Sequence, residues 1–382
     1  MLSKQRGVAA ALRADESNDD SLSYLKHISR IKHEILNGYF GAWLGILSRS
    51  FNHLAYFDCF AGDGRYVDEN RQPLPGSPQR AVGIANDLVD KTKGGLSLTL
   101  GFIELDRTKA ARLRIDLATV ATPGVKCTVL SGDARDLVGE ILEALKSRSG
   151  TVPTLFFVDP YGHPLPVPIL RKLLAIPKAE VLVNLMWYRI SMDLGNEERV
   201  PHFNYMFGHE SWMDQKFMRL TGREREESFL EYFEQQVSAP NHVHFPMPYS
   251  PEDRVAAPDK RRKFYLVHFS SHPRAATAMK AVMHRAEKNI ERLYGSTNQT
   301  NFDFAEPATL RVAELSRILS ATFHSNQRIT FREVLDLTAN LQYFEPEYRK
   351  ALRQLHDEGK IQIDRRESKR TGLSDGDIIR FL

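Results

Sequence analysis

Cysteine is scarce in this sequence of 382 residues, where only Cys59 and Cys127 occur. The two lie far apart, and neither belongs to a cluster with metal-ligand spacing, so the sequence provides neither a disulfide framework nor a zinc site. The histidines between 202 and 244 include a His-Val-His alternation, but no cysteine or carboxylate spacing supports a metal there. We therefore expect no bound metal and a reducing, cytoplasmic environment.

Long apolar runs and a strong charge imbalance are also missing. No window approaches the roughly 20 apolar residues of a membrane span, and the first residues lack the apolar core of a signal peptide, so we expect a protein that is neither exported nor inserted. The 52 basic and 48 acidic residues leave a formal net charge of +4, which permits contact with nucleic acid without demanding it. With 42% hydrophobic residues, the chain is long enough for one large core and a smaller domain.

The most informative stretch is 56–64, YFDCFAGDG, in which an apolar strand runs into a turn with glycines at Gly62 and Gly64. Glycine allows a sharp bend and a close approach of a ligand to the backbone, so such a turn is typical of the first loop of a nucleotide-type site in a doubly wound sheet. The dinucleotide fingerprint, with three glycines at fixed spacing, is not present. The turn alone therefore indicates a ligand site but not its ligand.

Predicted strands and helices alternate around this turn. Residues 1–20 end in an acidic polar stretch and are expected to be flexible, whereas apolar positions at helical spacing predict one or two helices over 21–48. After a loop at 65–78, the pattern predicts helices near 79–91, 108–119, 137–146 and 168–174, and strands near 96–105, 125–130, 154–158 and 181–186. Such alternation produces parallel βαβ units, so we expect an α/β fold with a doubly wound, Rossmann-like sheet over 21–294.

Acidic residues fall at or near the ends of successive predicted strands, at Asp58, Glu104, Asp133 and Asp159. The carboxyl edge of an open α/β sheet is where such folds bind ligands. A carboxylate after the second strand can accept both hydroxyls of a ribose, and one after the third can accept from an adenine amine. The pattern indicates an adenosine-containing cofactor. The alternative is that Glu104 and Asp133 merely cap the helices that follow them.

Several other segments allow two interpretations. Lys32 and His33, on the predicted N-terminal helix, belong either to a solvated face or to the ligand site. A helical insertion is predicted over 187–248, and its many aromatic residues form either a satellite core or the wall of a substrate pocket. The basic run 260–263 precedes a strand near 264–269 and a helix near 275–288, and it is either a solvated turn or a phosphate contact.

A polar stretch at 295–302 is predicted to be a linker to a second domain, 303–382. Helices are expected near 308–323, from Thr330 to 340 with a Thr330–Glu333 capping box, and from 346 to 359. Strands near 361–364 and 377–381 flank a basic tip, and three helices with such a ribbon describe a winged helix. Arg349, Lys350 and Arg353 would lie on its third helix, and the domain binds either nucleic acid or another protein.

The motifs DCFAGDG, FIELD, SGDA and FFVDPYG, in this order, resemble those of class I S-adenosylmethionine-dependent methyltransferases. More narrowly, the FAGxG turn, the GSP loop at 76–78, the Asp-Pro-aromatic-Gly turn at 159–162 and the segment KFYLVHFSSHPRAATAMKAVM resemble the three-Cys-motif partner family, from about Lys32 to Met283. Two features depart from the usual pattern: the long interval between the first two acidic residues, which the GSP loop fills, and Asp63 in the turn.

The resemblance also implies roles for individual residues. It assigns the methionine part of S-adenosylmethionine to Asp58, Gly62 and Gly64, the ribose to Glu104 and the adenine to Asp133, and it adds Phe60 as a further cofactor contact. The turn Asp159-Pro160-Tyr161-Gly162 is similar to the Asp-Pro-Pro-Tyr motif of enzymes that methylate exocyclic amines of bases, and closer to the Asp-Pro-Phe-Gly turn of tRNA guanine-amine methyltransferases.

This last turn implies a chemistry. An aromatic amine is a poor nucleophile, and a carboxylate with a backbone carbonyl can accept its protons while the ring stacks on Tyr161. Asp159, Pro160 and Tyr161 are therefore the candidate catalytic residues, and the alternative is that Asp159 caps the next helix. A cytosine-carbon methyltransferase needs a cysteine after a proline in this region, and neither cysteine follows a proline.

We therefore predict an S-adenosylmethionine-dependent methyltransferase that acts on an exocyclic amine of a nucleic-acid base. Substrate contacts are expected from Lys32, Gly162, Arg365, Arg366, Lys369 and Arg370. One alternative is a cofactor-binding partner subunit of a three-Cys-motif protein, without transfer activity of its own. Another is a small-molecule methyltransferase, and the sequence does not distinguish DNA from RNA as the substrate.

Overall fold

The computed structural model describes residues 23–24, 27–62, 64–68, 70–92, 95–146, 150–160, 162, 164–248, 262–294, 308–365 and 372–382. Contacts group the chain into two compact units: Met1–Pro240 with Phe245–Ser271, and Asn241–His244 with His272–Leu382. The predicted flexible segment 1–20 and the predicted linker 295–302 lie outside the described residues. Among the described residues, no helix has both the length and the apolar character needed to cross a membrane.

The central sheet has seven strands in the order β6-β5-β2-β7-β8-β10-β9. Its strands are β2 (His53–Asp58), β5 (Ser97–Glu104), β6 (Val125–Ser131), β7 (Thr154–Val158), β8 (Ala179–Leu185), β9 (Asn241–Pro248) and β10 (Arg262–Ser270). The pairs from β6 to β8 are all parallel, and β10 runs antiparallel to β8. The predicted, mostly parallel α/β sheet is thus confirmed. Its order reverses between β2 and β7, which is where such sheets form a ligand crevice.

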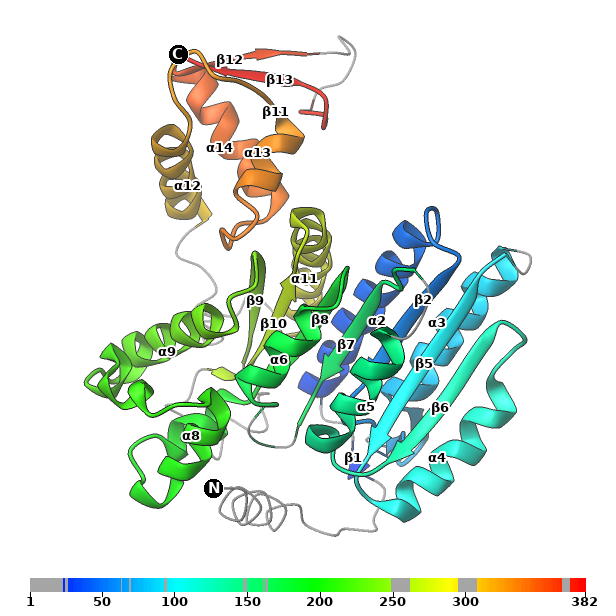
Figure 1. The fold of residues 1–382 in the computed structure, drawn as a ribbon. Helices are drawn as coiled ribbons and strands as arrows, with labels where there is room; N and C mark the ends of the chain where they lie inside the picture. The colour runs from blue at the N-terminus through cyan, green and yellow to red at the C-terminus, as the bar shows by residue number, and fades with distance from the viewer. Residues whose placement is uncertain are drawn as a thin grey trace. The chain divides into compact units, whose positions relative to one another are not determined.

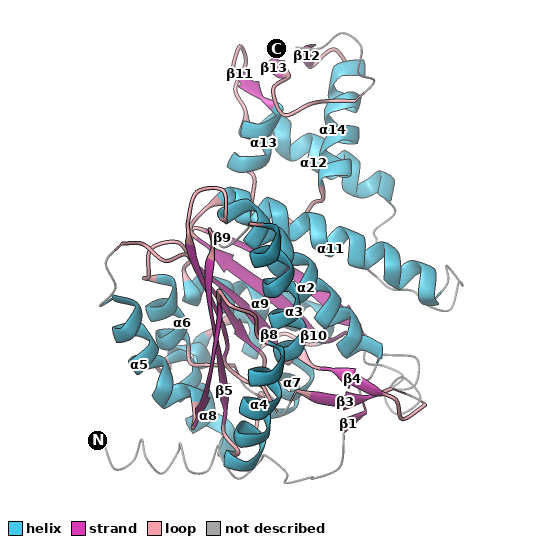
Figure 2. Cartoon of the chain, turned by 90° about the vertical axis from the view of Figure 1, so that its right-hand side faces the viewer, coloured by secondary structure: helices cyan, strands magenta, loops and turns pink. Residues whose placement is uncertain are grey.

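Helices cover both faces of the sheet, as Figures 1 and 2 show. The first five are α2 (His27–Leu47), α3 (Ser77–Lys91), α4 (Arg107–Val120), α5 (Ala134–Lys146) and α6 (Val167–Leu174). Each overlaps a helix expected from the sequence, because its apolar positions recur at helical spacing and its neighbours are strands.

The two faces of the sheet differ in chemistry. Side chains alternate between faces along a strand, so residues paired in register share a face. On one face, buried apolar residues such as Phe57, Val158 and Val183 form a core with the buried sides of α5 and α6. The opposite face of the same strands carries buried polar residues, namely Tyr56, Asp58, Glu180, Asn184 and His268.

Helix α2 satisfies part of this polar face. The Glu180 carboxylate accepts hydrogen bonds from the Tyr39 hydroxyl and, at 3.1 Å, from the Trp43 indole, both on α2. The His268 ring on β10 lies 2.9 Å from the same carboxylate. A buried carboxylate needs such partners because burial without hydrogen bonds costs several kcal/mol. The network therefore fixes α2 against β8 and β10.

Residues 65–78, predicted as a loop, contain a hairpin instead. Strand β3 (Arg65–Val67) pairs antiparallel with β4 (Pro73–Pro75) and parallel with β1 (Ser23–Tyr24). Asp68 closes the turn by accepting from the amides of Asn70 and Gln72. Proline has no amide to donate, so two prolines in three residues favoured a loop, and the structure accommodates them on the edge strand β4.

The predicted helical insertion contains α7 (Trp187–Asp193), α8 (Val200–Phe207) and α9 (Gly222–Val237), but its end is strand β9, which the sequence analysis missed. Two prolines in β9 masked its alternating pattern. The aromatic side chains Phe203, Phe207, Trp212, Phe217 and Phe229 are buried in the core with α5 and α6. These five belong to the main core of the first unit and not to a satellite core.

The second unit contains α11 (Pro273–Tyr294), α12 (Ala308–Thr322), α13 (Phe331–Leu337) and α14 (Glu345–Asp357), with the strands β11 (Arg328–Thr330), β12 (Ile361–Asp364) and β13 (Ile378–Phe381). The strands form an antiparallel sheet in the order β11-β13-β12. The Thr330–Glu333 capping box is present as predicted, whereas β11 was not predicted. A core including Phe331, Tyr348 and Ile379 joins these elements.

The Glu180 network generates a stability prediction. We expect Glu180→Leu to lower the free energy of unfolding of the first unit by at least about 3 kcal/mol, because it leaves buried donors without an acceptor. Glu143→Leu is the control, since Glu143 is exposed and pairs only at the surface with Lys146, and should cost no more than about 0.5 kcal/mol. All three tryptophans belong to the first unit, so urea unfolding followed by tryptophan fluorescence measures both effects. Equal midpoints for the two variants would contradict the prediction.

Candidate active site

Asp58 ends strand β2 and connects it to the GSP loop. Its fully buried carboxylate accepts from the Phe60 amide at 3.1 Å and from the Ser77 hydroxyl at 2.6 Å. Burial raises the pKa of Asp58 to about 7, although both hydrogen bonds act in the opposite direction. Ser77 is also the first residue of α3, so this contact holds the strand end and the helix start together.

The glycine turn has the backbone that the sequence predicted. Gly62 and Gly64 have φ values of +65° and +70°, in the left-handed region that favours glycine. The Gly76 amide donates to the Gly64 carbonyl at 2.7 Å, and a Cβ on Gly64 would lie 2.3 Å from the Gln79 side chain. A Cβ on Gly62 would meet nothing closer than 3.9 Å. A side chain at Gly64 would therefore clash with Gln79, whereas the space beside Gly62 is free of contacts under 3.9 Å. Such free space beside the backbone is what a ligand-binding turn requires.

Glu104 lies at the end of β5, beside this turn. Its carboxylate accepts from the Asp106 amide at 2.8 Å. Burial raises the pKa of Glu104, and hydrogen bonds from the backbone of Asp106 and Gly62 lower it in part. The N-cap of α4 is Asp106, which accepts from the Thr108 and Lys109 amides. The capping alternative for Glu104 is therefore wrong, and Glu104 is placed next to the glycine turn.

Asp133 follows β6 and has a different environment. Its carboxylate accepts from the Arg135 guanidinium at 2.8 and 2.7 Å and from the Arg135 amide at 2.9 Å. Its backbone carbonyl accepts the amides of Asp136 and Leu137, at the start of α5. The structure thus supports the local, helix-terminal role for Asp133, and its contact with an adenine stays a prediction.

Asp159 follows β7 and is held from two sides. Lys32 of α2 donates to its Oδ2, and Asn184 of β8 donates to its Oδ1 at 2.5 Å. The next helix, α6, has Pro166 as its N-cap and no side-chain cap, so the alternative that Asp159 caps this helix is wrong. Lys32 is only 9% exposed, and its ammonium lies 5.7 Å from the centre of the Phe264 ring. Lys32 therefore does not lie on a solvated helix face, and its role in the ligand site stays a prediction.

The neighbouring residues are also buried. His33 is buried, and burial together with the charge of Lys32 lowers its pKa to about 3, so its ring is neutral. Pro160 and Gly162 are buried, and Gly162 has a φ of +137° that favours glycine. Phe60 is half-buried. Tyr161 lies outside the described residues.

Asn184 is the residue that the sequence analysis missed. It stands inside the apolar run VLVNL, which reads as an ordinary buried strand. The signal that could have found it is register: Val158 pairs with Val183, so the next pair is Asp159 and Asn184, on the same face.

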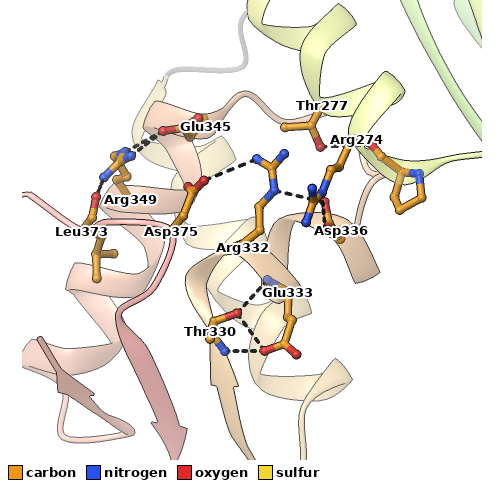
Figure 3. Close-up of polar contacts among 11 residues, drawn as sticks. Arg274, Thr277, Thr330, Arg332, Glu333, Asp336, Glu345, Arg349, Leu373 and Asp375 are labelled. Carbon is orange, nitrogen blue, oxygen red and sulfur yellow. Dashed lines mark hydrogen bonds and ion pairs between the residues drawn. The ribbon is translucent and has the colours of Figure 1, made fainter. Parts of the chain in front are cut away.

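The predicted basic surface of the second unit is described only in part. Arg366, Lys369 and Arg370 lie outside the described residues, and Arg365 is exposed. Arg349 bonds to Glu345 and the Leu373 carbonyl, as Figure 3 shows, and lies 4.8 Å from the Phe331 ring. Arg349 therefore has a structural role, whereas Lys350 and Arg353 of α14 are exposed.

Comparisons with known proteins place these observations in context. No family model and no curated protein sequence matches the chain. Among solved structures, a Legionella pneumophila protein of the family model DUF519 is similar at 13% identity and a TM-score of 0.39, with 68% of this chain and 90% of that chain covered. Human methyltransferase-like protein 13, solved with S-adenosylhomocysteine, is similar at 11% identity and a TM-score of 0.36, with 71% and 97% covered.

A DUF574 family protein of Streptomyces avermitilis is similar at 14% identity and a TM-score of 0.34, with 63% of this chain and 83% of that chain covered. At these identities and scores, the likenesses establish neither a family nor an activity for the chain. The three-Cys-motif partner family is not confirmed by them. Among the described residues, no group of histidine, cysteine, aspartate or glutamate side chains could hold a metal ion.

The residues at this edge fit S-adenosylmethionine in part. The open space above Gly62 and the adjacent carboxylate of Glu104 suit a backbone-contacting ligand with hydroxyl groups. Asp133 is the departure from this fit, because Arg135 engages both of its oxygens.

The raised pKa of Asp58 predicts a pH dependence. The folded protein holds a proton on Asp58 up to about pH 7, whereas the unfolded chain releases it near its ordinary value of about 4. Stability from this group is therefore full below about pH 4 and falls by about 1.4 kcal/mol per pH unit until about pH 7. His33 has the opposite sign, because the unfolded chain binds a proton that the folded state excludes.

The measurement is the difference in unfolding free energy between the parent and Asp58→Asn, from urea melts at pH 4.5 to 8. The contribution of His33 cancels in this difference. The parent should lose stability relative to Asp58→Asn as pH rises to about 7, and the difference should then stay constant. A difference independent of pH would show that Asp58 is ionised in the fold throughout.

Proposed function

We propose that the chain is an S-adenosylmethionine-dependent methyltransferase acting on an exocyclic amine of a nucleic-acid base. The observation that carries the proposal is the arrangement of Asp159, held by Lys32 and Asn184 at the carboxyl edge of the sheet, near the Asp58 strand end and the glycine turn. The resemblance of the motifs in this order to class I methyltransferases, and of 159–162 to the turn of amine methyltransferases, supports the same assignment.

The chemistry follows from the acceptor. When bound, S-adenosylmethionine supplies an electrophilic methyl group: the amine nitrogen forms the new N–C bond with its lone pair, and the electrons of the broken S–C bond stay on sulfur. Asp159 accepts a hydrogen bond from the amine. This bond raises the electron density on the nitrogen and orients its lone pair toward the methyl group. The nitrogen is positively charged after transfer, so its proton is acidic and passes readily to Asp159 or to solvent.

Lys32 positions this carboxylate. Its ammonium bonds to Oδ2 of Asp159, while each carboxylate oxygen can accept two hydrogen bonds, so lone pairs remain for a substrate. A side chain that is held from two sides loses little conformational entropy when the substrate binds. Its geometry is already the one that the transfer reaction needs. We propose that Pro160 and Gly162 shape the turn and that Tyr161 stacks on the base.

The second unit is proposed to dock the nucleic acid. Lys350 and Arg353 are exposed on α14, and the predicted wing residues Arg365, Arg366, Lys369 and Arg370 would add phosphate contacts. The proposed name for its fold is a winged helix. The alternative, a partner subunit of a three-Cys-motif protein that binds the cofactor without transferring its methyl group, rests on the narrower family resemblance.

Glu104 and Asp106 offer a matched pair for testing the cofactor site. Glu104→Ala should weaken the binding of S-adenosylhomocysteine by at least about tenfold, because a charge-assisted hydrogen bond is worth about 1.5–3 kcal/mol. Asp106→Ala removes the cap of α4, so it should cost about 1 kcal/mol of stability and leave affinity within about twofold. Calorimetric titration and melting curves measure both. No binding by the parent at any reachable concentration would end the cofactor assignment.

Asp159→Asn tests the transfer step. We expect it to retain S-adenosylhomocysteine binding and to lower the rate of methyl transfer by at least about 100-fold, because the amide no longer offers two acceptor oxygens beside the amine. The measurement is tritium transfer from labelled cofactor to total RNA and total DNA. A variant that transfers at the parental rate would remove Asp159 from the chemistry. A parent that binds the cofactor but labels neither nucleic acid would favour the partner-subunit alternative.

A further inference from the structure

Asn184 has a side chain whose orientation is determined by its neighbour. It is 2% exposed and lies beside Asp159. A carboxylate can only accept hydrogen bonds, so the Asn184 atom at 2.5 Å from Asp159 Oδ1 has to be the amide nitrogen. The Asn184 oxygen is then turned away, and this buried atom has no hydrogen-bond partner among the described residues.

An orphan acceptor of this kind points to a donor from outside the chain. A buried polar atom without a partner costs about 1–3 kcal/mol, and protein interiors rarely tolerate this cost without use. Among the described residues, the neighbouring Lys32 and the Asn184 nitrogen both bond to Asp159, which leaves the Asn184 oxygen available to a donor from a ligand.

The spacing of the two acceptors suits an amino group. The oxygen and nitrogen of one amide are about 2.3 Å apart, so the Asn184 oxygen lies within about 5 Å of Asp159 Oδ1. An –NH2 group that donates two hydrogen bonds of about 2.9 Å at about 120° has acceptors about 5 Å apart. The separation of the two oxygens is therefore compatible with two hydrogen bonds from one amine nitrogen.

We propose that the Asn184 side-chain oxygen is the second acceptor for the target amine and makes the site selective for –NH2 over a carbonyl or hydrogen at the same position. This inference rests on the proposed function and assigns its specificity. Asp159 accepts one amine hydrogen and Asn184 the other, in place of the backbone carbonyl that the resemblance implied. A base with a carbonyl there would place an acceptor against two acceptors, and a base with hydrogen would leave the Asn184 oxygen unpaired.

The test compares oligonucleotides that differ only at the amine: oligo(G) with oligo(I), oligo(C) with oligo(U), and oligo(A) with the purine-riboside oligomer. Affinities are measured at saturating S-adenosylhomocysteine. We expect the parent to prefer one amine-bearing oligomer over its counterpart by at least about tenfold. Asn184→Leu, which keeps the size and removes the acceptor, should reduce this preference to below about threefold and leave S-adenosylhomocysteine affinity unchanged.

Asn184→Asp provides a conservative rescue with a pH signature. Two adjoining carboxyl groups share a proton at low pH, so the introduced group then donates to Asp159 and offers its other oxygen to the amine. The preference should therefore return as pH is lowered, because the protonated group restores both the donation to Asp159 and the acceptor for the amine. If Asn184→Leu fails to fold, this pH series decides alone, and a preference independent of pH overturns the inference.

Two results separate this inference from the proposed function. A parent that methylates an amine, with Asn184→Leu retaining the full preference, would overturn the role of Asn184 and leave the proposed function intact. A parent that transfers methyl groups but shows no preference for any amine-bearing oligomer would likewise overturn the inference. If the parent labels no nucleic acid, the proposed function is wrong, and the inference that rests on it is wrong as well.

Discussion

The ion pair between Lys32 and Asp159 is the contact on which the arrangement of the site depends. It joins helix α2 to the carboxyl end of β7, and the Glu180 network joins the same helix to β8 two to three turns further along. Lys32, Tyr39 and Trp43 are spaced by seven and four residues, so they share one face of α2. A helix fastened at both points holds its side chains at fixed positions above the sheet.

The polar lining under α2 would be costly in a protein without a ligand site. Asp58, Asp159, Glu180, Asn184 and His268 lie on one face of neighbouring strands, whereas the opposite face is apolar. Replacing buried ion pairs by apolar residues is often neutral or stabilising, so charge is poorly explained here by stability alone. Glu180 is satisfied from within the chain by Tyr39, Trp43 and His268. The Asn184 oxygen, the Tyr56 hydroxyl and Nδ1 of His268 on the same face have no partner among the described residues, and burial raises the pKa of Asp58 at the carboxyl edge.

Much of this arrangement could be predicted from the sequence, and the limits have physical causes. The acidic residues at strand ends could be predicted because the end of an apolar run marks the end of a strand in the sequence. Parallel strands then bring these ends to one edge of the sheet. Asn184 was missed because one polar residue in an apolar run gives no periodic signal, and only register reveals its neighbour. The β3–β4 hairpin was missed because prolines occupy an edge strand. The sequence places Arg349 on the third helix of the second domain, but it cannot show that Glu345 and the Leu373 carbonyl engage its guanidinium.

The most direct test of the account is to locate the transferred methyl group. Total RNA and DNA would be incubated with the protein and S-adenosylmethionine carrying a trideuterated methyl group, then digested to nucleosides for mass spectrometry. We predict that the label lies on an exocyclic nitrogen of one base. Label on a ring carbon, on a ribose oxygen or on a small molecule alone would contradict the assignment of this edge as an amine methylation site.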